Sequence, residues 1–232
     1  MTSEEQVVFL FDVDDTLLDN DTAQNDYLEH ITKNFGEPAA QRYWAIFQEL
    51  FRELGYADYL GALQRYRLEH LHDPRLLMMS CFLLDYPFED RLYPRALEVL
   101  RHLQRFGLTV ILSDGDVVFQ PRKIQRSGIR DAVEGHMLIY VHKEVELRDV
   151  ERLYPADRYV LVDDKLRILT AVKQIWSGRV TTIQPRQGHY ANDPKEQAAY
   201  PPADITVERI GDLLNYDRSA LLSAPSGSFA TS

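Results

Sequence analysis

Short apolar runs that stop abruptly at polar residues constrain the fold of this chain more than any other feature of its sequence. Residues 7–11 (VVFLF) stop at the acidic stretch 12–16 (DVDDT), and residues 108–112 (LTVIL) stop at Ser113. Similar runs occupy residues 137–141, 159–162 and 180–183. Short runs that are rich in β-branched residues are typical of strands buried on both faces. The pattern therefore predicts a sheet whose strands end in polar side chains.

Helical patterns separate these runs. Pro94 begins one helix, which has an apolar face and Gly107 as its stop signal. Residues 166–176 repeat apolar side chains at helical spacing, and residues 120–126 and 145–153 are further helix predictions. Strands that alternate with helices predict an α/β protein with a parallel sheet and right-handed crossovers.

The stretch from residue 22 to residue 90 has a different pattern. It shows helical periodicity without a convincing strand, and it holds nearly half of the aromatic residues of the chain. This density of large side chains predicts a small helical domain with its own core. We therefore expect a core of residues 1–20 and 91–216, interrupted by an inserted helical domain of residues 21–90. Residues 217–232 are predicted to form a flexible tail, because this segment is rich in Ser and Ala and almost without charge.

Composition disfavours several classes of protein. Acidic residues outnumber basic ones by 36 to 26, and the net charge of −10 disfavours nucleic-acid binding through a broad basic face. The apolar run 76–84 is too short to cross a membrane, which takes about 20 residues. The single cysteine, Cys81, fits a reducing compartment, and residues 1–6 lack the basic and apolar regions of a secretory signal. We expect a cytoplasmic protein that binds neither nucleic acid nor membrane.

Polar side chains at the predicted strand ends bring several reactive groups to one edge of the sheet. These residues are Asp12, Asp14, Ser113, Lys143, Asp163 and Asp164. Ligands bind at the carboxyl ends of parallel strands, so residues far apart in the sequence could share one crevice. Clustered carboxylates repel each other unless a cation lies among them, and oxygen ligands favour Mg²⁺ over zinc. A carboxylate can also attack phosphorus and form an aspartyl-phosphate, so the sequence predicts Mg²⁺-dependent phosphate chemistry.

The same residues resemble the motifs of a known superfamily. Residues 12–16 (DVDDT) resemble the DxDxT signature of the haloacid dehalogenase (HAD) superfamily, in its phosphatase branch. Ser113, Lys143 and the pair Asp163 and Asp164 resemble its second, third and fourth motifs, in that order. The helical insertion is similar to the C1-type cap of that superfamily. The resemblance implies a Rossmann-like α/β core with an inserted all-helical cap.

The resemblance also implies catalytic roles. Asp12 would be the nucleophile and a metal ligand, and Asp14 would be the general acid/base, with its backbone carbonyl on the metal. Lys143 would offset the negative charge of Asp12 and of the phosphoryl group. The implied reaction is Mg²⁺-dependent hydrolysis of a small phosphorylated metabolite, and the sequence leaves a homodimer open.

Phosphate and metal binding would fall to further residues of the same motifs. Thr16 and Ser113 would hydrogen-bond to the phosphoryl group, together with backbone N–H groups near Asp114. Asp164 aligns with the metal-binding Asp of the fourth motif. Asp163 takes the place of a frequent glycine and would act as a further ligand in the outer shell of the metal.

Two positions depart from the superfamily pattern. Ile168 stands four residues after Asp164, where many relatives carry a further Asp or Asn. Glu144 follows Lys143 in place of the common proline. The first departure raises the question of how strongly the chain would bind a metal.

Other functions stay open from the sequence. A haloacid dehalogenase would attack carbon without using the second acid of the first motif, so Asp14 argues against that reaction. A phosphomutase would share the phosphatase mechanism. A receiver-like signalling module would place its phosphoacceptor at the third strand and would lack the long helical insertion. A non-catalytic HAD-fold binding protein is disfavoured by the intact Asp12 and Asp14.

Ordinary structural roles are the alternative at several positions. Lys143 could be a surface lysine, and Ser113 could bond its own backbone in a turn. Asp163 or Asp164 could cap the helix that follows. His189, in a loop after the strand of residues 180–183, is interpreted as a structural residue.

Overall fold

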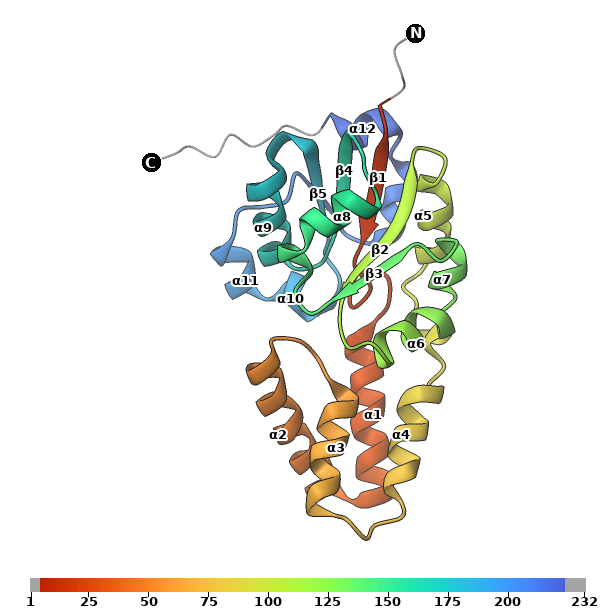
Figure 1. Ribbon diagram of the computed structural model, residues 1–232, viewed down its shortest axis with the longest axis vertical. Coiled ribbons are helices and arrows are strands. Elements are labelled where there is room, and N and C mark those ends of the chain that lie inside the picture. Colours follow the sequence, from red (N-terminus) through yellow and green to blue (C-terminus); the bar gives the residue numbers. More distant parts are fainter. Residues whose placement is uncertain (1–4, 224–232) are drawn as a thin grey trace.

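The computed structural model describes residues 5–223 and shows an α/β architecture on one six-stranded parallel sheet (Figure 1). The strand order is β3-β2-β1-β4-β5-β6, which places β1 between β2 and β4. The strands are β1 (Val7–Phe11), β2 (Leu108–Asp114), β3 (Met137–Tyr140), β4 (Arg158–Val162), β5 (Val180–Pro185) and β6 (Ile205–Val207). The predicted parallel sheet is confirmed, and all five apolar runs form strands. The sequence pattern missed β6 because it has three residues, of which one is buried.

Each face of the sheet has its own hydrophobic core, because alternate residues of a strand point to opposite faces. Val7, Phe9 and Phe11 belong to one core, whereas Val8 and Leu10 belong to the other. The first core is covered by α5 (Ala96–Leu103), α6 (Phe119–Arg126), α7 (Ile129–Ala132), η4 (Ile210–Asn215) and α12 (Arg218–Leu222). The second core is covered by α8 (Leu147–Leu153) and α9 (Leu166–Trp176).

Four helices fill most of the segment in which the sequence predicts a helical insertion. They are α1 (Asn20–Phe35), α2 (Glu37–Leu54), α3 (Tyr59–Glu69) and α4 (Leu76–Asp85), and they lie beyond the carboxyl ends of the strands (Figure 1). The rings of Tyr27 and Tyr43 meet edge to face with centroids 5.1 Å apart. The Tyr43 hydroxyl donates to the carbonyl oxygen of Tyr59 at 2.9 Å. The four helices thus share an aromatic core, while the bounds of a separate cap domain stay a prediction.

Two connecting segments join these helices to the sheet, and they lie side by side. The Asp19 N–H donates to the Arg91 carbonyl at 2.8 Å, and the Tyr93 N–H donates to the Leu17 carbonyl at 3.0 Å. Leu18 and Leu92 form an antiparallel bridge between the same segments. This pairing holds the first turn of α1 next to the acidic motif that follows β1.

The prediction for the C-terminus is wrong for its first residues. Residues 218–222 form α12, and Leu221 is fully buried. The Asp217 side chain accepts the Ala220 N–H at 2.8 Å and caps this helix. A capping acid and a buried leucine outweigh the Ser- and Ala-rich composition here. The rest of the predicted tail, residues 224–232, lies outside the described residues.

Short helices complete the structure near the carboxyl ends of the strands and elsewhere. They are η1 (Phe88–Arg91), η2 (Lys143–Val145), η3 (Ser177–Arg179), α10 (Gly188–Asn192) and α11 (Pro194–Ala199). Among residues 5–223, no helix combines the length and the hydrophobicity that crossing a membrane requires.

Candidate active site

The three central strands bring the acidic motifs together. Because β1 pairs in parallel with both β2 and β4, the residues that follow these strands meet at one edge of the sheet. One oxygen from each of Asp12, Asp163 and Asp164 lies within 4.8 Å of the others. Residues separated by about two thirds of the chain thus form one buried acidic cluster.

Lys143 is buried among these acids at the start of η2. Its Nζ lies 2.5 Å from Asp12 Oδ1 and 2.7 Å from Asp163 Oδ2. Burial lowers the pKa of Lys143, but the surrounding carboxylates of Asp12, Asp163 and Asp114 raise this pKa above its ordinary value. The Lys143 side chain therefore stays charged. This placement excludes the interpretation as a surface lysine.

The carboxylate oxygens of the cluster differ in their partners. Asp12 Oδ2 and both carboxylate oxygens of Asp164 are buried without a hydrogen-bond partner among the described residues. Asp163 Oδ2 also has no hydrogen-bond partner but forms an ion pair with Lys143 Nζ at 2.7 Å, and Asp163 Oδ1 accepts the Lys165 N–H at 2.9 Å. Buried polar atoms rarely lack a partner. The free oxygens of Asp12 and Asp164 therefore fit a hard divalent cation such as Mg²⁺ better than those of Asp163 do.

The charges of the cluster support the same interpretation. The pKa of Asp164 lies well above its ordinary value, mainly because of burial. The ammonium group of Lys165 lowers this pKa, but the carboxyls of Asp163 and Asp12 raise it further. Burial also raises the pKa of Asp12, but the ammonium groups of Lys143 and Lys165 lower it below the ordinary value. Asp12 is therefore ionised here, whereas Lys165 compensates the charge of Asp164 only in part. A bound divalent cation would supply the remaining positive charge.

The two departures from the superfamily pattern have clear places in the structure. Ile168 is fully buried in the core that α8 and α9 cover, so this position supplies no ligand to the acidic cluster. Glu144 accepts a hydrogen bond from Arg167 at 2.6 Å and does not pair with the neighbouring Lys143. The residues that could hold a metal in this structure are thus Asp12 and Asp164, with Asp163 beside them.

Asp14 is surrounded by polar side chains of α6 and α1. Its Oδ1 lies 2.7 Å from Lys123 Nζ, and its Oδ2 accepts from Gln120 Nε2 at 3.3 Å. Gln120 Nε2 also donates to Ser113 Oγ at 3.0 Å, and Lys123 Nζ donates to Asn20 Oδ1 at 2.9 Å. Gln120 thus links two predicted site residues, and Lys123 ties Asp14 to the first turn of α1.

Sequence reasoning missed Gln120 and Lys123. It predicted a helix over residues 120–126 but assigned no role to its polar residues. Both side chains are buried, with 3% and 1% of the residue exposed. Their spacing of three places them on the same face as the buried Ile124, and two polar residues on a buried face were the available signal.

Thr16 and Ser113 are buried at the same edge of the sheet. Thr16 Oγ1 accepts the Asp164 N–H at 3.0 Å, which holds the loops after β1 and β4 together. Ser113 Oγ accepts from Gln120 and donates to the Asp114 carbonyl at 3.3 Å. The Asp114 carboxylate accepts the Lys143 N–H at 2.7 Å. The contacts of these residues with a phosphoryl group stay predictions.

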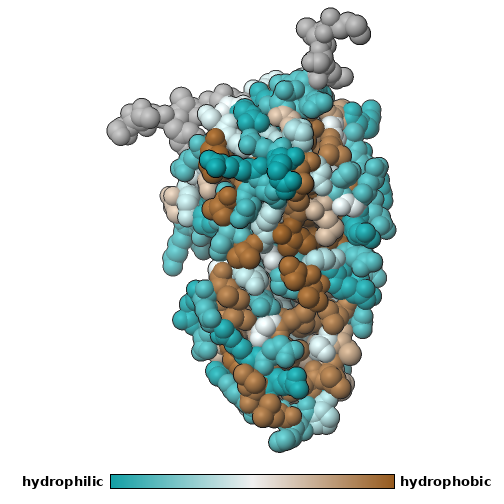
Figure 2. Space-filling view, viewed as in Figure 1, coloured by the Kyte–Doolittle hydropathy of each residue, from teal (hydrophilic) through white to brown (hydrophobic). Residues whose placement is uncertain are grey.

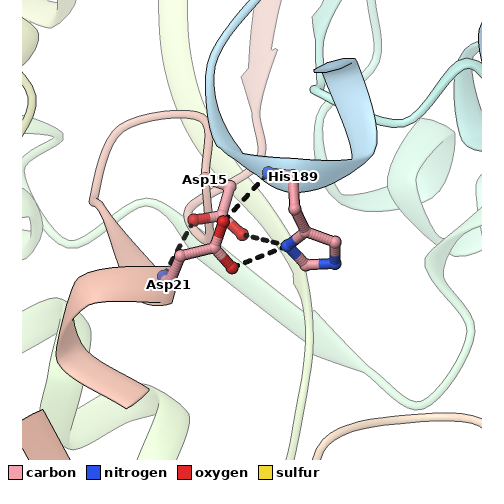
Figure 3. A group of neighbouring side chains, drawn as sticks. All are labelled: Asp15, Asp21 and His189. Atoms are coloured by element: carbon pink, nitrogen blue, oxygen red, sulfur yellow. Dashed lines mark hydrogen bonds and ion pairs between the residues drawn. The ribbon is translucent and has the colours of Figure 1, made fainter. Parts of the chain in front are cut away.

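A second acidic group joins α1 to α10 (Figure 3). His189 Nδ1 lies 2.6 Å from Asp21 Oδ1 and 3.7 Å from Asp15 Oδ2, and the His189 N–H donates to Asp21 Oδ2 at 2.9 Å. Asp15 Oδ1 accepts the N–H groups of Asn20 and Asp21. A Cβ at Gly188, whose φ is +68°, would lie 2.3 Å from the Asp15 Cβ, so this close approach requires glycine. The oxygens of this group have partners, which agrees with a structural role for His189.

The hydrogen bond with Asp21 and the neighbouring carboxylates raise the pKa of His189 above its ordinary value despite partial burial. Burial and the carboxylates of Asp21 and Asp14 raise the pKa of Asp15 to about 7. The hydrogen bond with His189 lowers the pKa of Asp21 despite partial burial, so both shifts favour a charged contact between α10 and the first turn of α1.

Comparison with known proteins identifies the family. The model of the haloacid dehalogenase-like hydrolase family matches residues 7–175, which is most of the chain. The chain belongs to this family. A crystal structure of a haloacid dehalogenase-like hydrolase from Burkholderia xenovorans LB400 shares 63% sequence identity, covers 92% of this chain and 100% of its own, and superimposes with a TM-score of 0.88.

More distant HAD-like structures share the fold. L-2-haloacid dehalogenase from Xanthobacter autotrophicus is 19% identical, covers 90% of this chain and 96% of its own, and has a TM-score of 0.60. The HAD-hydrolase YfnB from Bacillus subtilis, in a structure bound to magnesium, is 17% identical, covers 92% of this chain and 100% of its own, and has a TM-score of 0.61. No curated protein sequence matches this HAD-like hydrolase.

Proposed function

We propose that this HAD-like hydrolase is a Mg²⁺-dependent phosphatase that hydrolyses small-metabolite phosphomonoesters through an aspartyl-phosphate. The observation that carries the proposal concerns Asp12. One of its carboxylate oxygens pairs with Lys143 at 2.5 Å, and the other has no hydrogen-bond partner among the described residues. A held and desolvated carboxylate with one free oxygen is suited to nucleophilic attack.

In the proposed reaction, the Asp12 carboxylate forms a bond to phosphorus while the bond from phosphorus to the ester oxygen breaks. Lys143 keeps Asp12 oriented and offsets the charge on the phosphoryl oxygens. Mg²⁺ bound by Asp12 and Asp164 would supply further positive charge to the same oxygens. Ser113 would donate a hydrogen bond to the phosphoryl group. Water then attacks phosphorus and releases phosphate, which restores the Asp12 carboxylate.

Asp14 is the proposed general acid/base. It would protonate the leaving alcohol oxygen and then accept a proton from the attacking water. Its contacts with Gln120 and Lys123 of α6 support this role, because Gln120 also contacts Ser113. A dehalogenase that attacks carbon has no use for this second acid, so the same contacts favour phosphoryl transfer over release of halide.

Phosphate release from p-nitrophenyl phosphate tests the proposal. We expect steady turnover with Mg²⁺, loss of turnover in excess EDTA and recovery when Mg²⁺ is returned, because the uncompensated carboxylates repel a phosphate dianion. We expect no chloride from 2-chloropropionate. Chloride release without phosphate release would identify a dehalogenase. Failure with both compounds and with a panel of phosphorylated metabolites would support a non-catalytic binding protein.

Lys123→Met is expected to lower kcat by roughly 100-fold, since Asp14 would lose the partner that orients it. The loss should be larger for an alkyl phosphate than for p-nitrophenyl phosphate, because p-nitrophenolate needs little protonation to leave. Lys173→Met is the matched control: Lys173 is also buried and pairs with Asp204 at 2.7 Å, outside the site. The measurement is kcat per folded molecule in steady-state kinetics. The conservative variant Lys123→Arg should recover part of the lost kcat. Equal losses in the two Met variants would contradict a role through Asp14.

A further inference from the structure

A cavity of about 1020 Å³ lies between the helical part and the carboxyl edge of the sheet. Asp14, Asp114 and Lys165 line its floor, next to the acidic cluster. Aromatic side chains form much of the remaining wall: Trp44, Phe47, Phe51, Tyr56, Tyr59 and Tyr190. Figure 2 shows the molecule hollowed where α2 faces α10 and α11, with hydrophobic atoms at the edge of the hollow. The site thus combines a charged floor with an aromatic wall.

The aromatic wall is a stripe along α2. Trp44, Phe47 and Phe51 are three and four residues apart, so they lie on one face of that helix. The rings of Trp44 and Phe47 are stacked, with centroids 4.8 Å apart and planes at 13°. Tyr43 and Leu50 lie on the adjoining side of α2 and belong, together with the buried Phe47, to the helical core, against which Trp44 packs. Phe51 nevertheless remains 38% exposed, so the helical core leaves part of this stripe uncovered.

The charges of the cavity limit how many phosphates a ligand can carry. Five acidic side chains line the cavity, against three from Lys and Arg. Of the cations, Arg167 is already paired with Glu144 at 2.6 Å, whereas Arg52 is exposed and keeps its charge while it donates to the Gln48 carbonyl. Lys165 is the cation that lies beside the acidic cluster, and its Nζ is 5.0 Å from the Tyr190 ring centroid. One phosphoryl group near Lys143 and Lys165 is accommodated, whereas a second would meet carboxylates.

We infer that the cavity binds the organic part of the substrate by stacking against the α2 rings, and that the substrate is a monophosphate ester carrying a planar aromatic group. This inference rests on the proposed phosphatase activity. Aromatic rings prefer offset stacking or edge-to-face contact with other rings. Pockets of this volume accommodate organic groups much larger than a short alkyl chain. The same charges disfavour bisphosphates and nucleoside di- or triphosphates.

Two esters with the same type of leaving group test the inference. 2-Phenylethyl phosphate and n-propyl phosphate both release a primary alcohol, so a difference in kcat/KM reports on the organic part. We expect a preference for the phenyl ester on the order of tenfold, carried by KM. The double variant Trp44→Ala, Phe51→Ala should remove this preference. Phe35→Leu, which changes an aromatic residue of α1 outside the cavity, should retain it.

The outcomes separate this inference from the proposed function. Equal kcat/KM for the two esters, or a preference that survives the double variant, would overturn the inference and leave the phosphatase intact. If neither ester is hydrolysed, the binding measurement below decides the inference, and turnover of p-nitrophenyl phosphate still decides the phosphatase proposal. Trp176→Phe leaves Trp44 as the sole tryptophan. Saturable quenching of Trp44 fluorescence by 2-phenylethyl phosphonate would support the aromatic site, and no quenching would overturn it.

Discussion

Asp12→Asn is expected to reduce phosphate release by roughly 10⁴-fold or more, to background, because an amide cannot form the covalent intermediate. The change keeps the size of the side chain. Lys143 Nζ also retains its contacts with Asp163 at 2.7 Å and with the Leu112 carbonyl at 3.3 Å, so the local structure should persist. Phosphate release and mass spectrometry of acid-quenched protein make the measurement, and no phosphorylated protein should be found.

Asp14→Asn is the informative comparison for the same experiment. It should retain some transfer from p-nitrophenyl phosphate, because that leaving group needs little protonation, and then stall before hydrolysis. A burst of p-nitrophenolate near one equivalent, with phosphate trapped on Asp12, is expected. The same burst in Asp12→Asn, or phosphate trapped on another residue, would show that Asp12 is not the nucleophile.

Lys143→Met is expected to lower kcat by about 10³-fold, because the variant removes the fixed positive charge beside Asp12. The buried carboxylates of Asp12 and Asp163 would also lose a shared partner, and breaking a buried ion pair costs about 3–5 kcal/mol of folding free energy. Activity must therefore be measured per folded molecule, with thermal unfolding followed in parallel.

Lys173→Met separates the two effects of Lys143→Met. Lys173 pairs with the buried Asp204 and donates to the Val180 carbonyl, so its replacement should destabilise the fold at a site without chemistry. We expect lower stability but ordinary kcat in that control. Near-normal kcat in folded Lys143→Met would remove Lys143 from the proposed mechanism.

Much of the sheet could be predicted because buried parallel strands impose a strong local pattern. The strands β1, β4 and β5 are buried over nearly their whole length, so the apolar runs that form them had to lie inside a layered α/β fold. The pattern failed where burial is weaker or depends on distant contacts. β6 has one buried residue, and α12 is stabilised by burial of Leu221 in a core that distant segments build.

The acidic residues of the site could be predicted because each follows a strand directly. Asp12 and Asp164 lie just after β1 and β4, which are neighbours in the sheet. A role in the site could not be assigned to Gln120 and Lys123 in the same way, because the sequence pattern of α6 is that of an ordinary amphipathic helix. Their contacts with Asp14 and Ser113 depend on how α6 packs against the loop after β1.

The sequence by itself determined the α/β class, the edge of the sheet that carries the acids, and the segment that forms helices. These properties follow from local periodicity and from the rule that parallel strands end at a common edge. Only the tertiary structure decided the partners of neighbouring side chains. Asp163 is paired with Lys143 while Asp164 keeps two free oxygens, although the two residues are adjacent and chemically identical. Beyond the end of a strand, the direction of a side chain depends on partners that other segments supply, and a linear pattern does not contain them.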